Sequence, residues 1–178
     1  MEFPGDWVLV AMVLAAAGLD LKCRRIPNRL TVSGFVIGLA FQGSLGAGPM
    51  MDGLAAALIA FALSVPVFAL GGLGGGDVKL LTAAGVFLGL DRLWGALLVT
   101  VLVGGAFALA AVLKQGRTVH TMANLYVVLR SLGRRDAYTG WKGEEGDAPL
   151  TIRSAGVITR PYGVAIAAGS IYAVLPFL

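Results

Sequence analysis

The sequence predicts an all-α integral membrane protein, a polytopic bundle of about six transmembrane helices that form a single membrane-embedded domain over residues 1–178. Three observations predict this class. Hydrophobic residues make up 57% of the chain and charged residues only 13%, whereas soluble globular domains carry about 25% charged residues. The mean hydropathy of +0.83 points the same way. The 26 glycines are typical of membrane helices, which approach one another closely through small residues.

The predicted spans are apolar stretches near the length of about 20 residues that a bilayer requires. They cover about 7–21, 30–45, 51–70, 78–90, 93–113 and 158–178. Glycine and proline in residues 43–49 predict a turn after the second stretch, and Pro66 predicts a kink in the third. The string GGLGGGD at 71–77 is expected to interrupt the helices, because glycine is costly in helix interiors.

The polar stretch from about 114 to 156 is expected to be a long cytoplasmic loop between the fifth and sixth spans. Residues 118–132 have apolar positions at the spacing of an amphipathic helix. This helix could lie on the membrane surface or pack against other loops, and the sequence leaves both open. The N-terminal residues carry two acids and no base, so the first stretch is expected to be a retained span rather than a cleaved signal peptide.

The basic residues predict an orientation in the membrane. With six spans, all of the 14 Lys and Arg residues except Arg92 fall on one side. The positive-inside rule makes that side cytoplasmic and places both termini outside. The net charge of +4 therefore does not indicate nucleic-acid binding. Cys23 is the single cysteine, which rules out an intrachain disulfide and a CxxC zinc site.

Two acids, Asp20 and Asp77, stand at the ends of apolar stretches on the predicted cytoplasmic side. Acids in such places tend to be functional. If the two meet, they form a carboxylate pair that shares one proton. The ionised acid can then take a proton from water, and the protonated acid can polarise a peptide carbonyl. Asp6, Asp52 and Asp91 are expected to be plain interfacial acids.

Three glycines, Gly74, Gly75 and Gly76, directly precede Asp77. Glycine permits unusual backbone conformations and close approach of another chain. Non-helical backbone at membrane depth is tolerated where protein or water surrounds it. The run is therefore expected to be a loop beside a water-accessible cleft, with a simple flexible turn as the alternative.

Three motifs carry a resemblance to a known family. GGGDVK at 74–79 resembles the GxGD motif of intramembrane aspartic peptidases. Asp20 followed by RRIPN at 24–28 resembles the first catalytic segment of type IV prepilin and preflagellin peptidases. RPYGVAIAAG at 160–169 resembles their Pro-[Phe/Tyr]-Gly segment before the last helix. The resemblance covers nearly the whole chain, and three motifs in this order are more specific than GxGD alone.

The resemblance implies roles for residues of these motifs. Asp20 and Asp77 would be the catalytic pair, and the glycines would let the loop approach the substrate. Lys79 would tune the charge of Asp77 or bind lipid headgroups. The other motif residues would support the site by shaping the turn after Asp20 and the start of the last helix; they are Ile26, Pro27, Asn28, Pro161, Tyr162 and Gly163. A plain helix-breaking turn explains the two prolines as well.

The implied activity is endoproteolysis of prepilin or pseudopilin-like proteins after a Gly, on the cytoplasmic side of the bacterial inner membrane. No cofactor or metal is expected, and the partners are the protein substrates and membrane lipid, with no nucleic acid. Because the chain begins close to the first motif and has one cysteine, it resembles a short peptidase-only form without the N-terminal zinc domain, and N-methyltransfer is not expected. The oligomeric state is left open.

Two other functions are weighed against the peptidase. A proton-coupled membrane transporter also uses intramembrane acids and broken helices, but no clear internal repeat is present. A non-catalytic membrane assembly protein is less favoured because both acids and the motif glycines are present. Within the long loop, the acids of residues 136–147 are hypothesised to hold a basic leader.

Overall fold

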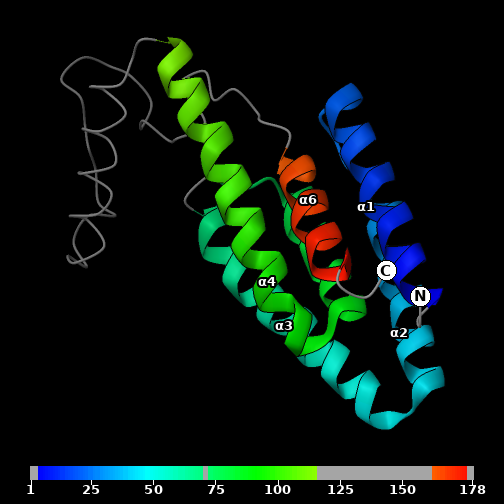
Figure 1. Ribbon diagram of the computed structural model, residues 1–178. Coiled ribbons are helices and arrows are strands. Elements are labelled where there is room, and N and C mark those ends of the chain that lie inside the picture. The colour runs from blue at the N-terminus through cyan, green and yellow to red at the C-terminus, as the bar shows by residue number, and fades with distance from the viewer. Residues whose placement is uncertain (1–3, 70–71, 116–161, 176–178) are drawn as a thin grey trace, which may run out of the picture. The chain divides into compact units, whose positions relative to one another are not determined.

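A computed structural model describes residues 4–69, 72–115 and 162–175, and every regular element in this part of the chain is a helix (Figure 1). The helices are α1 (Pro4–Cys23), α2 (Asn28–Leu45), α3 (Ala47–Ala69), α4 (Gly75–Gln115) and α6 (Tyr162–Val174). The all-helical prediction is confirmed for these residues. The predicted amphipathic helix 118–132 lies outside the described residues. The described residues up to Gly104, together with α6, belong to one compact unit.

The connection between α1 and α2 is short and fixed by its backbone. Arg24 has a positive φ of 50°, which ends α1, and its N–H donates to the carbonyl of Asp20 at 2.9 Å. Pro27 has φ −64° and ψ 134°, an extended conformation that suits the residue before a helix. Helix α2 therefore begins at Asn28, two residues earlier than the predicted span.

The turn between α2 and α3 is shorter than predicted. The sequence predicted a turn over residues 43–49, but α2 continues to Leu45 and α3 begins at Ala47. Gly46 alone separates them, with φ 129°, a conformation that only glycine adopts at little cost. One residue can reverse the chain here, so α3 packs back along α2. Pro66 lies inside α3.

Helix α4 is broken at Gly89, which has φ 65° and ψ 178°. The break agrees with the two separate stretches predicted over 78–90 and 93–113. Side chains from two other helices satisfy the backbone groups that it frees. Asp52 of α3 accepts a hydrogen bond from the N–H of Leu90 at 3.1 Å, and Gln42 of α2 donates to the carbonyl of Val86 at 3.0 Å. These bonds replace the intrahelical partners that helix ends lack.

A buried ion pair joins α1 to the same region. Arg92 donates to Asp6 at 2.9 Å, with side-chain exposures of 21% and 4%. Arg92 also donates to the carbonyl of Leu88 at 3.2 Å. The sequence predicted plain interfacial positions for Asp6 and Asp52, but each has a specific long-range partner. Asp91 is exposed.

Small residues bring the helices into backbone contact. A Cβ added at Gly85 would lie 3.1 Å from the carbonyl oxygen of Ala56 in α3. A Cβ added at Gly169 in α6 would collide with the carbonyl of Ala96 in α4. This agrees with the expected role of glycine in membrane helices. The apolar core draws on α1, α3, α4 and α6, and its fully buried members include Leu9, Val13, Ala16, Ala56, Ala60, Leu80, Ala84, Leu93, Ile166 and Val174.

Two of the described helical stretches, Ala47–Ala69 and Gly75–Ala110, are long and apolar enough to cross a membrane, and the shorter Tyr162–Val174 is also apolar. In the apolar 18-residue window of each long stretch, only 28% and 22% of the residues, respectively, are buried within the protein. Large apolar side chains such as Leu58 and Val101 are exposed, each at 68%, as expected for helices that face lipid. These features fit a membrane-embedded helical protein. The six predicted spans and their orientation stay predictions.

Candidate active site

Asp20 lies in the last turn of α1 and is buried, with 7% of its surface exposed. Its Oδ2 atom accepts a hydrogen bond from the N–H of Gly163 at 2.9 Å. Gly163 lies in the first turn of α6, where backbone N–H groups have no intrahelical partner. The positive end of the helix dipole also favours a negative charge at this position. Helix α6 therefore begins against the carboxylate of α1.

Asp77 lies in the first turn of α4 and is 8% exposed. Its Oδ2 atom accepts from the N–H of Gly74 at 3.0 Å, and its own N–H donates to the carbonyl of Gly74 at 3.0 Å. The sequence predicted a non-helical loop through Gly76, but Gly75 and Gly76 are helical. The cost of glycine in a helix is about 1 kcal/mol, and the two capping hydrogen bonds offset it.

The segments that carry the two acids meet at one end of the helices. Gly76 explains how their segments meet, because a Cβ added there would lie 3.1 Å from the Cβ of Ile26, in the connection after α1. Glycine thus allows the start of α4 to pack directly on the segment that follows Asp20.

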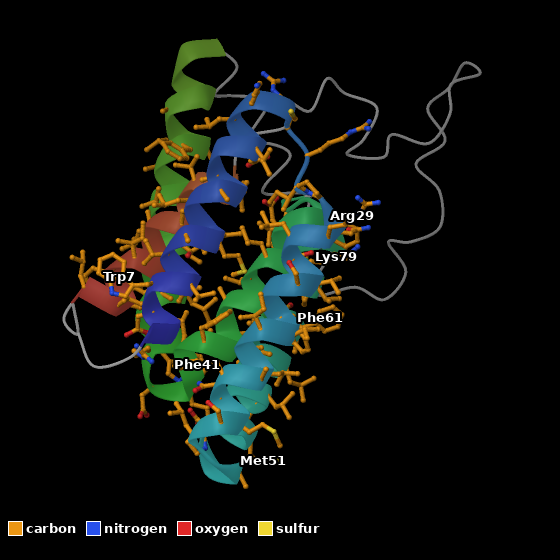
Figure 2. All side chains as sticks on the ribbon, turned by 90° about the vertical axis from the view of Figure 1, so that its right-hand side faces the viewer. Trp7, Arg29, Phe41, Met51, Phe61 and Lys79 are labelled. Carbon is orange, nitrogen blue, oxygen red and sulfur yellow. The ribbon has the colours of Figure 1, made fainter. Side chains whose placement is uncertain are left out.

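A second contact joins the same two segments. The ammonium of Lys79 donates to the side-chain oxygen of Asn28 at 2.9 Å. Both residues are exposed, and Pro27 directly precedes Asn28 as the N-cap of α2. Figure 2 shows Lys79 and Arg29 at the same end of the helices, far from Met51 in the first turns of α3.

The start of α6 has an additional anchor that the sequence did not identify. The ring of Tyr162 packs against Gly104 of α4, where an added Cβ would lie 2.6 Å from the ring atom Cε1. The glycine pair at 104–105 inside an apolar stretch is a signal of close helix approach. Of the predicted Pro-Tyr-Gly residues, Gly163 contacts Asp20, Tyr162 packs on Gly104, and Pro161 lies outside the described residues.

Metal ligands are not gathered in the described part of the chain. No three His, Cys, Asp or Glu side chains there are placed to hold a metal ion, and Cys23 is exposed. Chemistry without a metal or cofactor stays a prediction.

These features describe an all-helical protein with long apolar helices that fit a membrane and with two buried acids, Asp20 and Asp77, whose segments meet at one end of its helices. The family model described as "Type IV leader peptidase family" matches residues 7–109, more than half of the chain. The chain therefore belongs to the type IV leader peptidase family, and the matched region contains both Asp20 and Asp77.

Two relatives carry the name "Prepilin leader peptidase/N-methyltransferase". The protein from Escherichia coli (strain K12) is 31% identical over 118 residues, which cover 62% of this chain and 52% of the relative. The protein from Bacillus subtilis (strain 168) is 31% identical over 115 residues, which cover 60% of this chain and 44% of the relative. The matches thus span about half the length of these relatives. No solved structure gives a significant match.

Proposed function

We propose that this chain is an intramembrane aspartic endopeptidase that removes the basic leader from type IV prepilin or pseudopilin-like substrates by cutting after a Gly. Membership of the family and the names of the two relatives support a leader peptidase. The observation that carries the aspartic mechanism is the pair of buried acids, Asp20 and Asp77. Their segments pack together where Gly76 meets Ile26, and each acid accepts a backbone N–H at a helix start.

The proposed mechanism uses one proton shared by the two carboxyl groups, since two adjacent carboxylates do not easily both ionise. The ionised carboxylate takes a proton from water while the water oxygen bonds to the peptide carbonyl carbon. The protonated carboxyl gives its proton to the carbonyl oxygen. The C–N bond of the gem-diol intermediate then breaks as the nitrogen takes the proton first removed from water. One hydroxyl of the intermediate returns its proton to the carboxylate that had protonated the carbonyl oxygen, which leaves a carboxylic acid, an amine and the original shared proton. The amides of Gly163 and Gly74 hold the two carboxylates in position throughout.

The exposed glycines beside Asp77 suit an extended substrate. Gly74 and Gly75 are both exposed, and a Cβ added at Gly74 would lie 3.0 Å from Oδ2 of Asp77. A side chain at Gly74 would therefore crowd the carboxylate that has to meet the scissile bond. A peptide bond within a helix is shielded by its own hydrogen bonds, so the substrate must be extended at the cut. A Gly in the substrate makes that change easier.

We further propose that the site faces the cytoplasm from the bacterial inner membrane, with both termini outside. Exposed basic residues support this orientation. They lie near the end of the helices that carries Asp20 and Asp77, called the site end, and are Lys22, Arg24, Arg25, Arg29 and Lys79. N-methyltransfer belongs to the names of the relatives and is not part of the proposal.

The test is cleavage of a purified model prepilin by the wild-type protein and by Asp20→Asn and Asp77→Asn. Each substitution removes a group that must exchange a proton, so we expect cleavage to fall by at least about 100-fold while the protein still inserts into membranes. Asp91→Asn changes an exposed acid and serves as the control. Cleavage at the wild-type rate by either of the first two variants would refute the assignment. A wild-type protein without cleavage would favour a transporter or an assembly protein.

A further inference from the structure

We propose that Lys79 and Asn28 act as a polar clamp that positions Asp77 against Asp20. In this role they are positioning residues, which act through the two acids rather than on the substrate. The inference rests on the proposed peptidase function. The inference is based on the hydrogen bond that the Lys79 ammonium donates to the Asn28 side-chain oxygen at 2.9 Å. This bond joins residues that are 51 positions apart in the chain.

On one side of the clamp, the backbone from Asp20 to Asn28 is constrained. The N–H of Arg24 donates to the carbonyl of Asp20 at 2.9 Å. Pro27 has a restricted φ, and its carbonyl accepts from the N–H of Leu30 at 3.1 Å, in the first turn of α2. A displacement of Asn28 is therefore transmitted to the end of α1, where Asp20 lies.

On the other side, Lys79 and Asp77 share the first turns of α4. The N–H groups of Asp77 and Val78 both donate to the carbonyl of Gly74, at 3.0 and 3.2 Å. The two side chains therefore move with the same piece of helix. Fixing the Lys79 ammonium limits how far the first turns of α4 can shift, and such a shift would change the direction of the Asp77 carboxylate.

The clamp complements the packing of Gly76 on Ile26. That contact sets how closely the two segments approach. The hydrogen bond from Lys79 adds a second, polar point of contact between the same two segments. In the described part of the chain Lys79 forms no ion pair, so no acid there competes with Asn28 for its ammonium.

The experiment is a double-mutant cycle in a Cys23→Ser background, with cleavage of a model prepilin measured as kcat and KM. The variants are Lys79→Met, Asn28→Leu and the pair together. We expect each single variant to lower kcat by about tenfold to 100-fold, the range for a small misplacement of reacting groups, with KM unchanged. The pair should lose no more than either single variant, because both remove one interaction. Arg29→Met removes an exposed cation at the same end and should leave kcat unchanged.

Chemical rescue separates positioning from a general loss of folding. Lys79→Cys treated with 2-bromoethylamine regains an ammonium at nearly the native length, and Cys23 has been replaced because it is exposed. We expect kcat to recover when Asn28 is present and not when it is Leu. Equal recovery in both backgrounds, multiplied losses in the pair, or a change confined to KM would overturn the clamp and favour direct contact of Lys79 with a leader or headgroup.

The controls distinguish failure of the clamp from failure of the peptidase. If the wild type cleaves and Asp77→Asn does not, any of those results overturns the clamp alone. If the wild type fails to cleave, or Asp77→Asn cleaves normally, both proposals are overturned together.

Discussion

Replacing Gly163 with alanine should disable Asp20 without unfolding the protein. The added Cβ would lie 2.9 Å from Oδ2 and 3.1 Å from Cβ of Asp20, which is too close for the carboxylate to stay in place. Asp20 would have to turn away and lose the hydrogen bond from the Gly163 N–H. A hydrogen bond to a charged group contributes about 1.5–3 kcal/mol. If that loss falls on the transition state, kcat decreases by about 10- to 150-fold.

The assay is steady-state cleavage of a model prepilin by the purified variant, with thermal unfolding measured in parallel. Gly18→Ala is the matched control, because Gly18 lies on α1 two residues before Asp20 and an added Cβ has no neighbour within 4 Å. We expect the control to keep the wild-type kcat. If Gly163→Ala also keeps it, the start of α6 does not determine the position of Asp20, and this account of the site is refuted.

Three further predictions concern other parts of the fold and the orientation in the membrane. Gly89→Ala forces a side chain to adopt a φ of 65° beside the carboxylate of Asp52, and we expect it to lower the free energy of unfolding by about 1–3 kcal/mol; an unchanged denaturation midpoint would contradict this. Asp6→Asn leaves Arg92 with a neutral partner and should lower that free energy by roughly 3 kcal/mol, the low end for buried ion pairs; equal melting of variant and wild type would show that the pair contributes little. Exposed Cys23 should react with a membrane-impermeant maleimide in inverted vesicles, and labelling only in right-side-out vesicles would place the site end outside.

The sequence predicted the candidate site best where an acidic residue stands both at the boundary of an apolar stretch and within a recognisable motif. Asp20 and Asp77 were identified as a pair because each stands at the boundary of an apolar stretch and within a motif, and the structure brings their segments together. The apolar stretches also located the described helices to within a few residues, because burial and lipid exposure both require unbroken hydrophobic runs. The start of α4 differs because Gly75 and Gly76 are helical. Helix propensity is a weak local preference, and capping by Asp77 outweighs it.

The long-range polar contacts could not be predicted from the sequence. The hydrogen bond from Gln42 to the Val86 carbonyl joins residues 44 apart, and the Arg92–Asp6 pair joins residues 86 apart. No local pattern distinguishes an acid that caps a distant helix end from one that faces headgroups. Deciding between them requires knowledge of which helices are neighbours, and apolar periodicity alone does not give it.

The geometry of the candidate site depends on the break at Gly89, because the break sets the direction of the second part of α4. From Asp77 to Gly89 the helix rises by about 18 Å, away from the site. The chain then turns, and the second part of α4 returns until Gly104 reaches Tyr162, beside the Gly163 that contacts Asp20. The first residue of α6 is thus supported by a helix whose direction is set at the distant break. A variant that straightens α4 at Gly89 should therefore remove the Gly163 N–H from Asp20 and reduce cleavage, although Gly89 itself lies far from both acids.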